Sequence, residues 1–296
     1  MNRPKLFDFS SIFTQTITTN HFLRDEWNVD MKSKLSFKYL LHFCFLLILP
    51  AQGVLAADVK VMISAGFYGV YEKLAPAFES ATGNKLITIR GPSIGDSPEA
   101  IPTRLAAGQQ ADMVILDGEA AENLAKRGLV KHDSITILAL SQIGAAVKLN
   151  APKPDISNVD AFRKTLLAAS SIAYSDSGSG TYIANTMFNK LGILDQVKSK
   201  SIKVRGPPSG EAVAAVIARG EAEIGFQQVS EIIHTPGITY LGPIPKDLQP
   251  GFSFAGAITT NSTQPDAAAA LIRFLSSPNV IDVINTAGLI PAPRSK

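Results

Sequence analysis

The chain has 296 residues, of which 28 are Lys or Arg, 25 are Asp or Glu and only one is Cys. This balance leaves no strongly basic surface, so the composition argues against a nucleic-acid-binding protein. One cysteine excludes a disulfide framework, and His132 and His234 lie too far apart in the sequence to predict a metal site. We expect neither a metal nor an organic cofactor.

Residues 1–56 are predicted to be an N-terminal extension followed by a secretory signal peptide at about residues 31–56. Three lysines precede an apolar run over residues 39–49, and small residues follow as far as Ala56. This order predicts cleavage after Ala56 or Ala57, and the run is shorter than the ~20 residues that a membrane span needs. Whether translation starts at Met1 or Met31 stays open. We therefore expect a soluble protein exported to the periplasm.

Strands and helices alternate after the signal peptide, as is typical of an α/β fold. Strands are predicted at 59–63, 86–89 and 111–116, the second of them buried, and helices at about 70–82, 98–107 and 119–127. A strand, helix and strand in succession predict a right-handed crossover between parallel strands.

The chain then becomes strand-like over residues 135–149, and we expect it to enter a second lobe near residues 141–144. Predicted helices follow at 157–168, around 183–191 and at 211–218, the last capped by Ser209, and predicted strands at 172–174, 201–205 and 223–226. A strand at 252–259 and helices at 265–275 and 280–287 then complete the first lobe. The predicted lobes are 57–141 with 252–296, and 142–251. Each is expected to be a mixed, mostly parallel sheet flanked by helices, with a ligand cleft between them.

Four segments rich in Ser, Gly and amide residues follow predicted strands and precede predicted helices. In an open α/β sheet ligands bind at this edge, and helix N-termini offer free N–H groups to anions. Together with Ser209, they supply the candidate ligand-binding residues Ser64, Gly66, Phe67, Arg90, Ser93, Ser177, Ser179, Thr181, Ser209, Gln227 and Gln228. Such segments are also ordinary helix caps, so the prediction depends on all four converging on one cleft.

Arg90 is the one permanent cation among these candidates, and two interpretations of it stay open. It could face an anionic ligand, or it could pair with a surface carboxylate such as Asp96. The run Ser177-Gly-Ser-Gly-Thr lacks the glycine spacing of a dinucleotide site and the lysine of a phosphate-binding loop.

Several motifs together resemble the periplasmic type II solute-binding proteins, in particular the molybdate-binding family. They are Val59–Phe78, RLAAGQQADMVIL at 104–116, SGSGTYIAN at 177–185 and ARGEAEIGFQQVSEI at 218–232. The resemblance implies two α/β lobes joined by a two-crossing hinge, and an anion held in the cleft by hydroxyl and backbone N–H groups. It also implies a membrane permease as a partner; we expect a monomer.

The chain departs from molybdate binders in four ways. Gly66 stands where they place a serine, Gln228 where they place a tyrosine, the loop 91–100 looks longer, and Arg90 is an added charge. An arginine fork suits a carboxylate, so we predict a protein that binds a di- or tricarboxylate rather than molybdate and delivers it to an ABC-type transporter.

The alternative is an enzyme on the same scaffold, because a subgroup of molybdate-binding-like proteins isomerises aconitate by allylic proton transfer. Such an isomerase needs a base, for which Tyr68, Ser64, Ser93 and Glu231 are the weak candidates. Glu231, like Glu211, lies early in a predicted helix, where a solvated carboxylate is the more common role. A protein that only senses or scavenges an anion is a third, more remote alternative.

Overall fold

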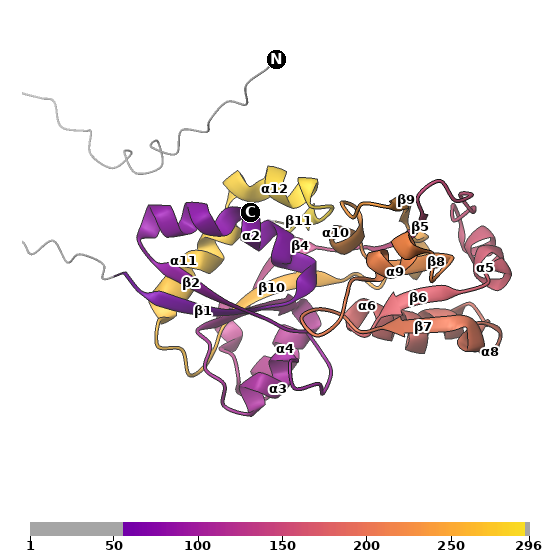
Figure 1. Ribbon diagram of the computed structural model, residues 1–296. Coiled ribbons are helices and arrows are strands. Elements are labelled where there is room, and N and C mark those ends of the chain that lie inside the picture. Colours follow the sequence, from indigo (N-terminus) through magenta and orange to yellow (C-terminus); the bar gives the residue numbers. More distant parts are fainter. Residues whose placement is uncertain (1–55, 294–296) are drawn as a thin grey trace, which may run out of the picture. The chain divides into compact units, whose positions relative to one another are not determined.

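The computed structural model describes residues 56–293, which form two mixed β-sheets flanked by helices (Figure 1). The predicted signal peptide lies outside these residues, apart from its last position. The first sheet has six strands in the order β11-β4-β10-β3-β1-β2. Their bounds are β1 Asp58–Ile63, β2 Lys85–Arg90, β3 Met113–Asp117, β4 Thr136–Leu140, β10 Ser253–Ile258 and β11 Ile290–Pro291.

The second sheet has five strands in the order β7-β6-β8-β5-β9. Their bounds are β5 Ile143–Lys148, β6 Ile172–Ser175, β7 Ser201–Val204, β8 Ile224–Gln228 and β9 Ile238–Pro243. We call the parts built on these sheets the six-stranded lobe and the five-stranded lobe. The chain passes from the first to the second between β4 and β5 and returns between β9 and β10. The two crossings lie side by side, since the Ser141 N–H donates to the Phe252 carbonyl at 2.8 Å.

Alternation along the strands explains how each sheet carries helices on both faces. In β1, Val59, Val61 and Ile63 pack with α2 (Ala65–Thr82) and α11 (Pro265–Leu275), whereas Met62 packs with the cluster under α3 (Ile101–Ala106) and α4 (Gly118–Lys126). β5 alternates in the same way between the two clusters of the five-stranded lobe. The remaining helices are α5 Val159–Ala168, α6 Gly178–Tyr182, α7 Phe188–Lys190, α8 Leu194–Val197, α9 Val213–Arg219, α10 Val229–Ile232 and α12 Ile281–Thr286.

Four local predictions need correction. The β2 strand is a half-buried sheet edge rather than a buried strand. The helix expected from Pro98 begins at Ile101, and the one expected at Glu211 begins at Val213, with Ala212 rather than Ser209 at its N-cap. Each sheet is parallel only on one side, because β10 in the first and β5 in the second run antiparallel to their neighbours. "Mostly parallel" was therefore too strong, while a mixed sheet is confirmed.

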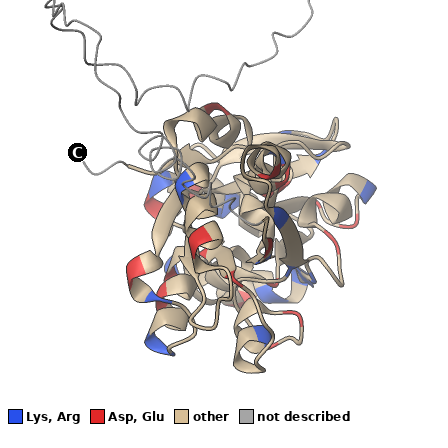
Figure 2. Cartoon of the chain, turned by 90° about the vertical axis from the view of Figure 1, so that its left-hand side faces the viewer, with Lys and Arg blue, Asp and Glu red and all other residues tan. Residues whose placement is uncertain are grey.

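Charged residues of both signs are interspersed along the cartoon in the view of Figure 2. No single helix in the described part of the chain has the length and hydropathy of a membrane span. The helix α11 and the segment Pro278–Thr286 reach that length only as a pair, which is bent by 57°. Four α11 side chains are buried in the core: Ala268, Leu271, Ile272 and Leu275.

Candidate functional site

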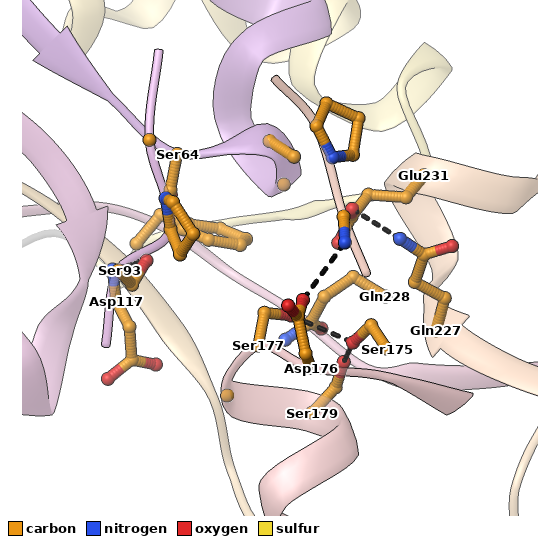
Figure 3. A pocket seen from close by; sticks show the side chains of 18 residues that line it. Ser64, Ser93, Asp117, Ser175, Asp176, Ser177, Ser179, Gln227, Gln228 and Glu231 are labelled. Carbon is orange, nitrogen blue, oxygen red and sulfur yellow. Dashed lines mark hydrogen bonds between the residues drawn. The ribbon is translucent and has the colours of Figure 1, made fainter. Parts of the chain in front are cut away.

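All four predicted segments converge on one cavity, of about 550 Å³ with the solvent at its mouth included (Figure 3). The lining residues come from both lobes, so the cavity lies between them. From the six-stranded lobe come Ser64, Ala65, Gly66, Gly91, Pro92, Ser93, Asp117 and Phe254. From the five-stranded lobe come Ser175, Asp176, Ser177, Gly178, Ser179, Gly206, Pro207, Gln227, Gln228 and Glu231.

Ser64 stands between β1 and the 18-residue helix α2, at the N-cap position. An N-cap serine ordinarily accepts a hydrogen bond from the first turn of its helix, but the Ser64 side chain makes none. The Ser64 residue is only 4% exposed, and its buried Oγ has no hydrogen-bond partner in the described structure. An unpaired buried hydroxyl costs free energy, and the Ser64 Oγ therefore remains available to form a hydrogen bond.

The ring of Phe254 explains why a glycine stands at position 66, where the molybdate-binding pattern has a serine. A side chain at this position would collide with the ring of Phe254, whose edge reaches the space that a Cβ would need. Phe254 itself lines the cavity and packs against Phe67. An apolar ring therefore stands close to the place where a serine hydroxyl would otherwise point.

The five-stranded lobe contributes a hydrogen-bonded group of hydroxyls at the start of α6. Ser175 Oγ lies 2.8 Å from Ser177 Oγ and 3.3 Å from Ser179 Oγ. The helix continues from α6 through a π-helical turn, Ile183–Met187, into α7. Gln228 accepts a hydrogen bond from Ser141 Oγ at 2.6 Å through Oε1, which leaves its amide NH₂ group for the cavity.

Glu231 is the titratable group whose environment is most unusual. Burial raises its pKa to about 7, although a hydrogen bond from Gln227 and the charge of Arg90 both act to lower it. The Gln227 Nε2 donates to Glu231 Oε2 at 2.6 Å. The other carboxylate oxygen, Oε1, has no hydrogen-bond partner in the described part of the chain. The Glu231 carboxyl group is not the fully solvated one that its place early in a helix predicts, because the residue is half-buried and lines the cavity between the lobes.

Two further carboxyl groups reach the cavity. Asp117 caps α4 by accepting from the N–H groups of Glu119 and Ala120, and burial raises its pKa. Asp176 accepts from the Gly206 N–H at 3.0 Å. No Lys or Arg is among the described residues that line the cavity. An anion there would be held by hydroxyls, amides and helix N-termini, not by ion pairs.

Arg90 does not line this cavity, although β1–β2 pairing places it beside Ile63, at the same sheet edge. The alternation of β2 gives the reason. Thr88 bonds Tyr71 of α2 at 2.8 Å, and Arg90, two residues on, faces the same helix. Its guanidinium lies 4.1 Å from the centre of the Tyr68 ring. Among the described residues Arg90 forms no ion pair, with Asp96 or with any other carboxylate. Its charge acts on Glu231 of the cavity, and the interpretation that it faces an anionic ligand stays a prediction.

Three other candidates also lie off the cavity. Phe67 is a core side chain with no exposed surface, so only its backbone could reach a ligand. Thr181 lines a separate hollow between α4 and α6, with Tyr182. Ser209 is exposed in the turn before α9, beside Glu99. The structure thus brings together seven of the predicted residues: Ser64, Gly66, Ser93, Ser177, Ser179, Gln227 and Gln228.

Two contacts join the lobes. Ser230 Oγ donates to the Gly66 carbonyl at 2.7 Å, and Arg205 pairs with Glu99 at 3.0 Å. Asp117, Ser175 and Asp176 are not among the residues predicted from the sequence, and Glu231 is predicted only as a weak candidate for a base. The missed signal was position: Asp117 and Ser175 end strands, Asp176 follows one, and Glu231 lies in the first turn of a short helix.

Two lobes around a cavity lined by hydroxyl, amide and carboxyl groups are typical of a solute-binding-protein architecture. A profile of the bacterial extracellular solute-binding proteins matches residues 59–290, and the chain belongs to this family. The resemblance predicted from the motifs is confirmed.

Two curated relatives align along most of their length. Aconitate isomerase of a Pseudomonas species is 45% identical over 251 residues, which is 83% of this chain and 94% of that protein. The molybdate-binding protein ModA of Azotobacter vinelandii is 27% identical over 240 residues, which is 79% of this chain and 90% of that protein.

Solved structures share the fold at lower identity. The A. vinelandii periplasmic molybdate-binding protein has a TM-score of 0.64 at 20% identity, covering 80% of this chain and 100% of that one. A periplasmic thiamin-binding protein has a TM-score of 0.63 at 16% identity, covering 81% and 84%. The predicted two-lobed α/β fold is confirmed.

Proposed function

We propose that the protein is an exported isomerase that interconverts cis- and trans-aconitate in the cavity between its lobes. The observation that carries the proposal is Glu231, a carboxyl group with a pKa of about 7 at a cavity that it shares with hydroxyl and amide groups and with the carboxyl groups of Asp117 and Asp176. A base of this pKa is matched to proton transfer near neutral pH. The 45% identity to an aconitate isomerase supports the same activity.

The chemistry needs one base and no redox partner. Glu231 removes a proton from the methylene carbon of aconitate, and the C–H electron pair forms a new double bond to the central carbon. The electron pair of the old double bond takes the proton back from Glu231 at the former vinyl carbon. One carboxyl group serves both steps, so atoms and charge balance, and the new double bond can form in the other geometry.

Negative charge spreads over the terminal carboxylates of the substrate during this transfer. Donors aimed at that charge lower the barrier because they need no rearrangement. The unpaired Ser64 hydroxyl, the first turn of α2 and the free amide of Gln228 are suited to this role. A bound trianion next to Glu231 also raises the pKa of its carboxyl group, so the pKa seen in kcat should exceed that of the free protein.

Proton NMR of trans-aconitate with the purified protein in D₂O tests the proposal. We expect cis-aconitate to form, and deuterium to enter the methylene group in the turnovers in which the proton on Glu231 exchanges with solvent before it returns. Glu231→Gln should slow both about 10³-fold, whereas Glu211→Gln, which alters a surface glutamate paired with Arg219, should change neither. An inactive wild-type protein, or a fully active Glu231→Gln variant, would contradict the proposal.

A binding protein that serves a membrane permease is the second candidate. The absence of any Lys or Arg among the described lining residues favours it, since neutral donors alone can bind an oxyanion. Titration with molybdate, tungstate, citrate and aconitate separates the candidates. Tight binding of molybdate without turnover of aconitate would favour the binder.

Export to the periplasm is part of the proposal. It rests on the order of charges, apolar residues and small residues before Ala56. N-terminal sequencing of the protein recovered from a periplasmic extract should begin at Ala57 or Asp58. A mature chain that begins at Met1 or Met31 would contradict it.

A further inference from the structure

The Gln227 side chain lies behind Glu231, at the end of β8, and is only 2% exposed. Its Oε1 accepts from the backbone N–H of Val213 at 3.1 Å, and its Nε2 donates to Glu231 Oε2 at 2.6 Å. Figure 3 shows this contact between the two labelled side chains. Gln227 therefore links the first residue of α9 to the carboxyl group of Glu231.

The first of these two contacts determines which way the amide points. A backbone N–H can only donate, so the atom of Gln227 that faces Val213 must be the oxygen. The amide nitrogen then has to face Glu231. The N-cap residue of α9, Ala212, has no side chain that could accept in place of Gln227, so this orientation also satisfies a buried N–H group.

We propose that Gln227 is a positioning residue, which holds one oxygen of Glu231 in place and leaves Oε1 turned to the substrate. The inference rests on the proposed function, because it assigns Glu231 as the base. A donor at 2.6 Å stabilises the ionised carboxylate and restricts its rotation. Gln227 itself transfers no proton.

Two substitutions separate positioning from simple support of the fold. Gln227→Glu keeps an acceptor for Val213 but removes the donor and adds a like charge. Gln227→Met removes the donor without adding charge. The readouts are the ¹³C titration of the Glu231 carboxyl, assigned by its loss in Glu231→Gln, and the pH profile of kcat/KM. We expect the pKa to rise by about 1 unit or more in Gln227→Glu and by less in Gln227→Met, with at least a 10-fold loss of kcat/KM at pH 6 in Gln227→Glu.

Gln249→Glu is the matched control. Gln249 is a half-buried amide that bonds only backbone atoms, of Ile143 and Ile244, in the same lobe. It should leave the titration of Glu231 unchanged. An unmoved pKa in both Gln227 variants, or an equal shift in Gln249→Glu, would overturn the positioning role. If the wild-type protein does not isomerise aconitate but the Gln227 variants still shift the titration of Glu231, the positioning role stands and the proposed function fails.

Discussion

The two lobes contribute chemically different halves of the cavity. The six-stranded lobe supplies an unpaired hydroxyl at Ser64, the first turn of a long helix and the apolar ring of Phe254. The five-stranded lobe supplies side chains that are already bonded to one another, with Glu231 and Gln227 among them. Donors without partners suit binding, whereas a bonded and desolvated carboxyl group suits proton transfer. Under the proposed function, the five-stranded half of the cavity carries the proton transfer and the six-stranded half contributes to binding.

Loss of the Glu231 carboxyl is the largest effect that this division predicts. Glu231→Gln keeps the shape and can still accept from Gln227, but it cannot take a proton. We expect kcat for aconitate to fall about 10³-fold, within the range of a lost general base. Ligand affinity should stay within a few fold, measured by calorimetry. A variant that lost binding along with activity would show that the halves are not separate in function.

The same substitution should change how stability depends on pH. Burial raises the pKa of Glu231 from 4.5 to about 7, so the folded state binds this proton more tightly than the unfolded state. The free energy of unfolding therefore decreases as pH rises from about 4.5 to about 7. At pH 8 Glu231→Gln should be the more stable protein by up to about 3 kcal/mol, with little difference at pH 4.

Urea unfolding at pH 4 and pH 8 measures the difference in unfolding free energy between Glu231→Gln and wild type. Glu211→Gln serves as a control of opposite sign, because hydrogen bonds from Arg219 lower the pKa of Glu211 and its contribution is lost as pH falls. Equal stability of Glu231→Gln and wild type at pH 8 would mean that ionising Glu231 does not destabilise the folded protein.

Placing a serine at position 66 tests the apolar part of the first half. Gly66→Ser must displace the ring of Phe254, and we expect a loss of about 2 kcal/mol in unfolding free energy, which is typical of overpacking. It should not gain molybdate binding. Gly69→Ser is the matched control, since a side chain at Gly69 of the same helix meets nothing within 4 Å. Equal Tm values for the two variants would contradict the argument.

Removing the unpaired hydroxyl should give the smallest effect. Ser64→Ala is expected to lower kcat/KM about 10-fold, as for a lost hydrogen bond to a charged group worth about 1.5 kcal/mol. Because Ser64 Oγ has no partner in the described structure, thermal stability should not fall. Ser175→Ala, whose hydroxyl contacts two others, should lower the Tm. A loss of stability in Ser64→Ala would show that Ser64 has a structural partner after all.

Prediction from the sequence succeeded where a local pattern of apolar and small polar residues also fixes a position in the sheet. Apolar strands followed by Ser, Gly or Gln located all four segments that meet at the cavity, because the strand ends share one edge of a sheet. It failed where side-chain direction decides. Arg90 lies at the predicted edge of the sheet, but strand alternation turns its side chain to Tyr68. The amino-acid composition of the segment does not predict that direction.

For Glu231 the sequence underestimated the role of the side chain's surroundings. Its early place in a helix suggested a solvated carboxylate, and only packing between the lobes buries it and raises its pKa. By itself, the sequence determined the order of strands and helices, the two-lobed fold and the edge at which a ligand would bind. These follow from hydrophobic period and turn residues close together in the chain. The tertiary structure decided which hydroxyl of the described residues is left without a partner and which carboxyl group has a raised pKa, since burial and hydrogen bonding depend on residues far apart in sequence.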